Sequence, residues 1–200
     1  MSKALRTLTY GLVAIVALFE LGVFWLMLHP NVSADYRAYF IDKTTTCLNQ
    51  PVAGTYTLGK TIDFTPPGAD DAKPVKVCGW EGPVGDGTHA VGTSTRLRFV
   101  YAEPVTGGLA LKLRMIAVNI GGQPTQRVEV DFNGTAIDTV TVTPDAPQDF
   151  TVTVPADLAA TANGRVELEL RFPDSVKIGA FDPDNRRRSI KLVSATLIPT

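Results

Sequence analysis

Cys47 and Cys78 are the only two cysteines of the chain, and their spacing suits a disulfide better than a metal site. Both follow a long apolar N-terminal run, so they fall in a part of the chain expected to be exported to oxidising conditions. A bridge closing a loop of about 30 residues contributes roughly 3 to 4 kcal/mol in the chain-entropy model. A zinc site is not expected, because His89 is the only histidine in this exported part.

A group of oxygen-bearing side chains lies near the C-terminus. Asp182, Asp184 and Asn185 could coordinate calcium, which prefers hard oxygen ligands. The segment lacks the glycine and the distal glutamate of an EF-hand loop. The alternative is a local ion pair between Asp184 and Arg186 that fixes the entry to the last strand. Apart from this calcium pattern, no cofactor is expected.

The sequence lacks the common catalytic signatures. It has no Gly-x-Ser-x-Gly elbow, no metal-ligand cluster and no glycine-rich phosphate loop beside a helix. Glu81 and Glu103 could serve as the carboxylate pair of a glycosidase only if the fold brought them to the required separation. We therefore expect a protein without enzymatic activity.

Residues 8–28 form an almost unbroken apolar run that is long enough to cross a bilayer as a helix. Lys3 and Arg6 precede the run and favour a cytoplasmic N-terminus. The alternative is a cleavable signal peptide, whose apolar core would be shorter, at about 7 to 15 residues. The expected location is the inner membrane of a bacterium. The expected division is a cytoplasmic segment 1–7, a transmembrane helix 8–28, a juxtamembrane segment 29–49 and a periplasmic domain 50–200.

Glu20 interrupts the apolar run near its middle. An ionised carboxylate at that depth costs about 2.5 to 3.5 kcal/mol on insertion scales. Two interpretations stay open. Glu20 is either protonated within a very apolar helix, or it contacts a polar or basic group of a multi-spanning partner.

The exported part has the pattern of an all-β domain, in which apolar and polar residues alternate between glycine, proline and asparagine breaks. Asn133-Gly134 predicts a hairpin with a type I′ turn, and 155–163 predicts a short helical connector. With a net charge of −1 and no basic stripe, nucleic acid is not an expected partner. The expected strands are 55–64, 95–101, 109–120, 127–132, 136–143, 150–154, 166–172 and 190–198.

Several short motifs follow one another in an order that resembles a known domain. Gly-Trp-Glu-x-Pro at 79–83, Gly-Thr-His-Ala-x-Gly at 87–92 and Thr-Arg-Leu-Arg-Phe at 95–99 are similar to the opening of a jelly-roll accessory domain. That domain is found at the ends of bacterial membrane glycosyltransferases and related enzymes of surface-polysaccharide synthesis. Val-x-Val-x-Phe-Asn-Gly at 128–134 and Asp-x-Arg at 184–186 are similar to its later landmarks.

The resemblance implies a jelly-roll-like antiparallel β-sandwich, of the carbohydrate-binding-module type, that assists a polysaccharide-synthesising complex without catalysis. Its implied partners are a polytopic membrane glycosyltransferase or related enzyme, and polysaccharide. Here the domain follows its own anchor, without the catalytic membrane portion that usually precedes it. We therefore expect an accessory subunit that docks through its helix and sandwich. The alternative is a free-standing glycan-binding module at the inner membrane.

Trp80 is the best candidate for contact with a sugar ring. An indole face can stack on the apolar side of a pyranose, while Glu81, His89 and Arg96 can form hydrogen bonds with its hydroxyl groups. The structural alternative is that Trp80 is a core residue, as tryptophans beside a disulfide in a β-sandwich commonly are. His89 stands where the resemblance leads us to expect a tryptophan, so one stacking surface is missing.

Overall fold

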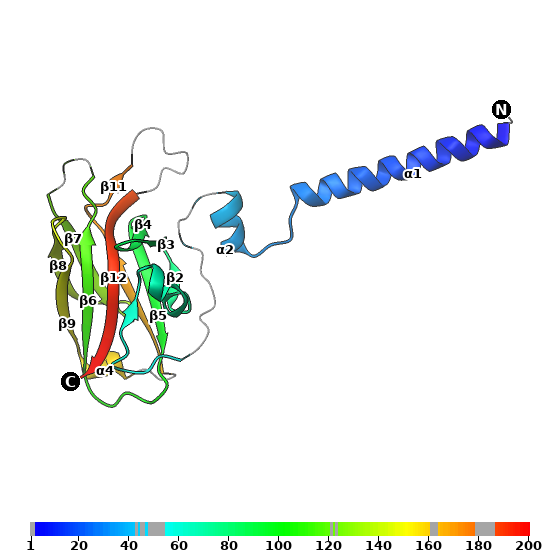
Figure 1. Ribbon diagram of the computed structural model, residues 1–200. Helices are drawn as coiled ribbons and strands as arrows, with labels where there is room; N and C mark the ends of the chain where they lie inside the picture. Colours follow the sequence, from blue (N-terminus) through cyan, green and yellow to red (C-terminus); the bar gives the residue numbers. More distant parts are fainter. Residues whose placement is uncertain are drawn as a thin grey trace.

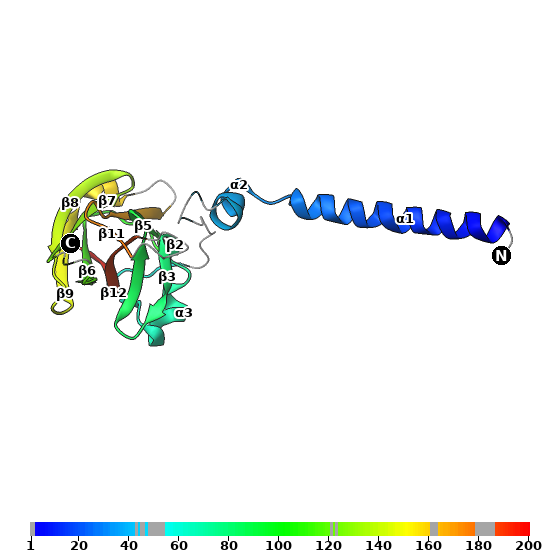
Figure 2. The ribbon, with the colours of Figure 1, turned by 90° about the horizontal axis from the view of Figure 1, so that it is seen from above.

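The structure is a computed structural model that describes residues 3–42, 44, 47, 55–120, 122, 124–160, 164–178 and 187–200. Helix α1 (Lys3–Leu28) has 26 residues, a mean hydropathy of 2.3 over its most apolar window, and no buried residue. It projects away from the rest of the protein in both ribbon views (Figures 1 and 2). The prediction of one N-terminal helix long and apolar enough to serve as a membrane anchor is confirmed.

A short helical turn follows α1. It consists of α2 (Ala34–Tyr36) and the π-helical segment η1 (Arg37–Ile41). The hydroxyl of Ser33 accepts a 3.2 Å hydrogen bond from the backbone N–H of Tyr36 and so caps the turn. An Arg37 guanidinium nitrogen donates to the Pro30 carbonyl at 3.2 Å. These two bonds hold the turn directly after the end of α1.

The body of the protein is a sandwich of two antiparallel sheets, seen as facing layers in Figure 2. The seven-stranded sheet has the order β3-β4-β12-β6-β9, with β1 and β11 also paired to β12, and the five-stranded sheet has the order β2-β5-β10-β7-β8. The first sheet contains β1 (Ile62–Asp63), β3 (Trp80–Val84), β4 (Gly87–Val91), β6 (Leu109–Ala117), β9 (Gln148–Val154), β11 (Val176–Lys177) and β12 (Arg187–Pro199). The second contains β2 (Lys76–Cys78), β5 (Ser94–Val100), β7 (Gln126–Phe132), β8 (Thr135–Val142) and β10 (Arg165–Arg171).

The core lies between the two sheets and follows from the alternation in the sequence. In β6, Leu109, Leu111 and Leu113 are buried, while the residues between them point outward. Leu168 and Leu170 of β10 alternate in the same way on the facing sheet. Because each strand hides one face, the polar side chains of its other face lie on the outside of the sandwich. The expected all-β sandwich is confirmed.

Three predicted elements are shorter than expected, one of them the strand predicted at 109–120, which ends as β6 at Ala117. Of residues 55–64, only Ile62–Asp63 forms a strand, because Gly59 adopts φ +86° in a turn that interrupts the extended backbone. The connector predicted at 155–163 contains the helix α4 (Ala156–Ala159), and 161–163 lie outside the described residues. Two further short elements, η2 (Pro66–Gly68) and α3 (Ala69–Ala72), precede β2.

Two local predictions are confirmed. Asn133 and Gly134 adopt φ values of 50° and 79° in the turn between β7 and β8, as a type I′ hairpin requires. Cys47 and Cys78 form a disulfide with a Cα–Cα distance of 4.4 Å. The bridge joins the chain that follows η1 to the end of β2.

Candidate functional site

Trp80 is half-buried and has two roles in the structure. Its ring packs against the core near Phe64, with ring centroids 5.9 Å apart. Its indole N–H donates a 2.8 Å hydrogen bond to the backbone carbonyl of Arg96. The part of the ring that stays exposed lines a pocket, so Trp80 is both a packing residue and a surface that a ligand can reach.

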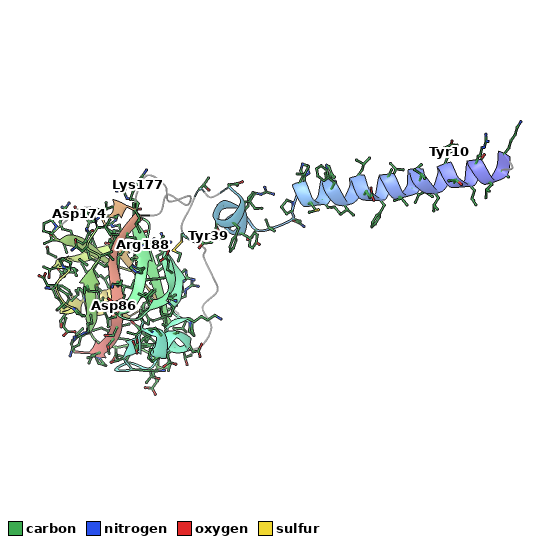
Figure 3. All side chains as sticks on the ribbon, turned by 45° about the horizontal axis from the view of Figure 1, so that its top comes forward. Tyr10, Tyr39, Asp86, Asp174, Lys177 and Arg188 are labelled. Carbon is green, nitrogen blue, oxygen red and sulfur yellow. A yellow bond between two sulfur atoms is a disulfide. The ribbon has the colours of Figure 1, made fainter. Side chains whose placement is uncertain are left out.

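This pocket has a volume of about 430 Å³ and lies between η1 and the side of the sandwich formed by α3, β2 and β3. We call it the juxtamembrane pocket. Figure 3 shows Tyr39 where the turn after α1 faces the sandwich, near the disulfide. Cys78 itself lines the pocket, so the bridge forms part of its wall. The lining also includes aromatic and charged side chains: Tyr39, Phe40, Trp80, Asp70, Lys73 and Lys76.

Two lysines line the same pocket. Lys76 is half-buried, and its ammonium donates to the backbone carbonyl of Glu81 at 3.3 Å. Burial lowers the pKa of Lys76, and the positive charge of Lys73 lowers it further. Within the part of the chain that the structure describes, neither lysine is ion-paired with a carboxylate. Their charge is therefore available to a ligand.

The other three predicted sugar-contact residues lie outside this pocket. Arg96 is on the outer face of the five-stranded sheet, where its guanidinium is 3.6 Å from Glu167 and 3.5 Å from Glu169. Glu81 pairs with Arg188 on the outer face of the seven-stranded sheet. The structure therefore brings Glu81 near His89, but it places Arg96 on a different sheet from both.

His89 is at the centre of this second polar group. It pairs with Lys191 across β4 and β12. Burial lowers the pKa of His89 below its usual 6.5, and the positive charge of Arg188 adds to the effect. Glu81 and Asp86 act in the opposite direction. Among the described residues, no hydrogen-bond partner is found for His89 Nδ1 or for Arg188 Nη1.

The remaining predicted groups are the carboxylate pair and the calcium candidates, and the structure describes only the first of them. Glu103 lines a second pocket of about 460 Å³ together with Tyr56 and Pro199, whereas Glu81 is bound to Arg188. These different surroundings give a glycosidase pair no support. In the described ranges, no group of three or more histidine, cysteine, aspartate or glutamate side chains could hold a metal ion. The calcium candidates, Asp182, Asp184 and Asn185, lie outside the described residues.

The sequence did not point to most of the juxtamembrane pocket. Tyr39 and Phe40 lie 11 and 12 residues after the end of α1, and aromatic residues near the end of an apolar helix are expected as membrane-interface residues. Lys73 and Lys76 lie more than 30 residues further along the chain. The disulfide is the one signal that could have linked the two segments, because it fixes the chain after η1 to β2.

No protein-family model matches the sequence, and no curated protein matches it either. The chain is similar to the CBM36-1 domain of a multidomain xylanase from the hindgut metagenome of Trinervitermes trinervoides (15% identity, 68% of this chain, 94% of that chain, TM-score 0.41). It is also similar to a CBM36 module in complex with calcium and xylotriose (13% identity, 69% of this chain, 98% of that chain, TM-score 0.40). A third similar structure is CsCBM6-3 from Clostridium stercorarium in complex with cellobiose (14% identity, 74% of this chain, 100% of that chain, TM-score 0.42).

Proposed function

We propose that this protein is a non-catalytic, membrane-anchored module that binds glycan in its juxtamembrane pocket. The observation that carries the proposal is the pocket itself, which joins the exposed part of the Trp80 ring with Tyr39 and Phe40. Aromatic faces next to polar groups are what a pyranose requires, since it presents apolar C–H faces and hydroxyl edges. A volume of about 430 Å³ is within the usual range for small-ligand pockets.

The position of the pocket in the chain supports a ligand close to the membrane. Tyr39 and Phe40 follow Leu28, the last residue of α1, by only 11 and 12 residues. With α1 inserted in a bilayer, the pocket lies near the outer surface of that bilayer. Lys3 and Arg6 favour a cytoplasmic N-terminus, so the proposed location of the domain is the periplasm of a bacterium.

A second candidate is an accessory subunit of a polysaccharide-synthesising complex, bound to a polytopic membrane glycosyltransferase or related enzyme. The observation that favours it is Glu20, which lies within α1, where no side chain is buried against the rest of the chain. A partner helix with a polar or basic group would relieve the cost of this carboxylate in lipid. The two candidates are compatible, since an accessory subunit can also hold the growing polymer.

Glycan binding is tested with the full-length protein in nanodiscs, on an array of neutral and acidic oligosaccharides. We expect saturable binding that the double variant Tyr39→Ala/Phe40→Ala reduces. Both residues lie in η1, outside the sandwich, so their removal leaves the sheets intact. The matched control is Tyr10→Ala, which removes an exposed tyrosine at the far end of α1 (Figure 3). Absence of binding to every oligosaccharide would reject the proposal.

The subunit candidate is tested by extraction of the tagged protein in mild detergent and mass spectrometry of the proteins that remain bound. A polytopic glycosyltransferase recovered with the natural chain and lost with Glu20→Leu is the expected result. Phe19→Leu, which changes a neighbouring exposed residue of α1, is the control. Equal recovery of that enzyme with all three chains would reject the role of Glu20.

A further inference from the structure

Lys73 and Lys76 differ from most basic side chains of the sandwich, which are neutralised by carboxylates. Lys60 is 2.9 Å from Asp71, Arg98 is 2.6 Å from Glu167, and Arg114, Arg127 and Arg171 also have acidic partners. Across the described ranges, no carboxylate lies within ion-pair distance of Lys73 or Lys76. With two lysines and the single carboxylate of Asp70, the charged side chains among the described lining residues have a net positive charge.

An anion in the pocket would relieve two costs at once. Lys76 is half-buried, which disfavours its charged form, and the positive charge of Lys73 disfavours that form further. A carboxylate or phosphate between them would replace this repulsion with charge-assisted hydrogen bonds. These bonds are shorter and stronger than those between neutral groups, so an anionic ligand gains more here than a neutral one.

The opposite charge in the same pocket sets the orientation of such a ligand. Asp70 also lines the pocket, and its carboxylate would repel an anion but accept hydrogen bonds from sugar hydroxyls. The aromatic rings of Tyr39, Phe40 and Trp80 provide the surface for the ring of the sugar. An acidic pyranose has all three features: an apolar face, hydroxyl groups and a single charged edge.

We propose that the ligand of the juxtamembrane pocket is an anionic saccharide whose carboxylate or phosphate group is held by Lys73 and Lys76. This inference rests on the proposed function and makes it more specific. Two chemical sources supply the charge, a uronic acid residue or a sugar phosphate. Both present oxygen acceptors to the same two ammonium groups.

The test uses titration calorimetry on the full-length protein in nanodiscs of phosphatidylcholine, whose headgroups carry no net charge. The probes are trigalacturonate with its methyl ester, and glucose 1-phosphate with methyl glucoside. Each pair differs mainly in the negative charge. We expect the charged member of one pair to bind roughly tenfold more tightly than its neutral counterpart, and the pair that shows this identifies the source of the charge.

Two variants assign the effect to the lysines. Lys73→Gln/Lys76→Gln should remove the preference for the charged probe and leave binding of the neutral probe within about twofold. Lys60→Gln, which removes an exposed lysine outside the pocket lining, should leave the preference intact. Raising the ionic strength should weaken only the charged probe, because the Debye length falls from about 30 Å at 0.01 M to about 3 Å at 1 M.

The outcomes separate the two proposals. Equal binding of charged and neutral saccharides, or a charge preference that survives Lys73→Gln/Lys76→Gln, would overturn this inference and leave the glycan-binding function standing. If the four probes and every oligosaccharide of the array fail to bind, both proposals fall. A charge preference lost only in the lysine double variant supports both.

Discussion

The indole N–H of Trp80 donates a 2.8 Å hydrogen bond to the backbone carbonyl of Arg96, and this bond links β3 of one sheet to β5 of the other. Gly79, with φ +77°, lies directly before Trp80, and a Cβ at that position would lie 2.5 Å from the carbonyl oxygen of Ser94. The backbone therefore lies very close to Ser94 where it crosses from the five-stranded to the seven-stranded sheet. Trp80 fixes this corner while its exposed part faces the juxtamembrane pocket.

The Trp80 bond leads to a prediction about stability. Trp80→Phe keeps an aromatic ring but removes the donor, and it should lower the free energy of unfolding by about 1 to 3 kcal/mol. Urea unfolding of the detergent-solubilised protein, followed by circular dichroism, measures the change. Trp25→Phe alters the other tryptophan, which lies in α1, and should leave the sandwich transition unchanged. An unchanged midpoint for Trp80→Phe would mean that the bond contributes nothing measurable.

A second prediction concerns Tyr56, whose buried hydroxyl donates to the carbonyl of Lys60 at 2.6 Å and accepts from the N–H of Leu197 at 3.0 Å. Tyr56→Phe leaves the Leu197 N–H without its partner, so we expect a loss of about 1 to 3 kcal/mol. The midpoint of urea unfolding measures this loss of stability. Tyr36→Phe, at an exposed site, is the control and should stay within about 0.5 kcal/mol of the natural chain.

His89 predicts a dependence of stability on pH. Burial and Arg188 lower its pKa in the folded protein below 6.5, so the unfolded chain binds more protons between the two values. The free energy of unfolding should therefore fall as the pH drops below about 6.5 and level off below the folded pKa of His89. His89→Gln should flatten this part of the pH profile. If the free energy of unfolding falls with pH at the same slope in the natural chain and in the His89→Gln variant, the assignment of this slope to His89 is wrong, whatever the overall stability of the variant.

Asn133 predicts two separable effects at the β7–β8 turn. Its side chain donates to the Leu158 carbonyl and accepts from the Glu167 N–H, both at 2.9 Å. Asn133→Gly tolerates the positive φ but loses both bonds, at a cost of about 1 to 2 kcal/mol. Asn133→Ala should cost about 1 kcal/mol more, because alanine is strained in the left-handed conformation.

The comparison of these two Asn133 variants in urea is the decisive measurement. Equal midpoints would show that backbone strain at the turn is negligible. Thr135→Ala, an exposed change next to the turn, controls for general sensitivity of the hairpin and should shift the free energy of unfolding by less than about 0.5 kcal/mol.

The parts of the fold that could be predicted from the sequence are those determined by residues close together in the chain. Alternation in residues 109–117 and the Asn133-Gly134 pair each act over a few neighbouring positions, so they define a strand and a hairpin without knowledge of the rest. A strand near residues 75–78 was expected and is present as β2, but β3 and β4 were not predicted, because both are short and β3 contains Gly82 and Pro83. Such segments become strands only when a neighbouring sheet provides their hydrogen-bond partners.

The candidate site was harder to predict than the fold. Trp80 was identified from its chemistry alone, and the structure places part of its ring in a pocket. Its predicted companion Arg96 is close to Glu167 and Glu169 instead, because the register between β5 and β10 places Arg96 opposite Glu169, and Glu167 lies two residues before Glu169 in β10. Register and tertiary contact between distant segments have no signature in a single sequence. For the same reason Lys73 and Tyr39 could not be linked before the structure was known.

The Cys47–Cys78 bridge also sets how far the sandwich can move from α1. Cys47 follows Leu28 by 19 residues, whereas Tyr56, the first described residue after Cys47 that is bonded to the sandwich, follows Leu28 by 28. At about 3.3 to 3.6 Å per residue, the corresponding chain lengths are at most about 70 Å and about 100 Å. Reduction of one bond would lengthen the tether by up to about 30 Å and would free the aromatic turn from the wall it completes. With α1 inserted in a membrane, thiol chemistry around the sandwich would then control the height above that membrane at which the domain works.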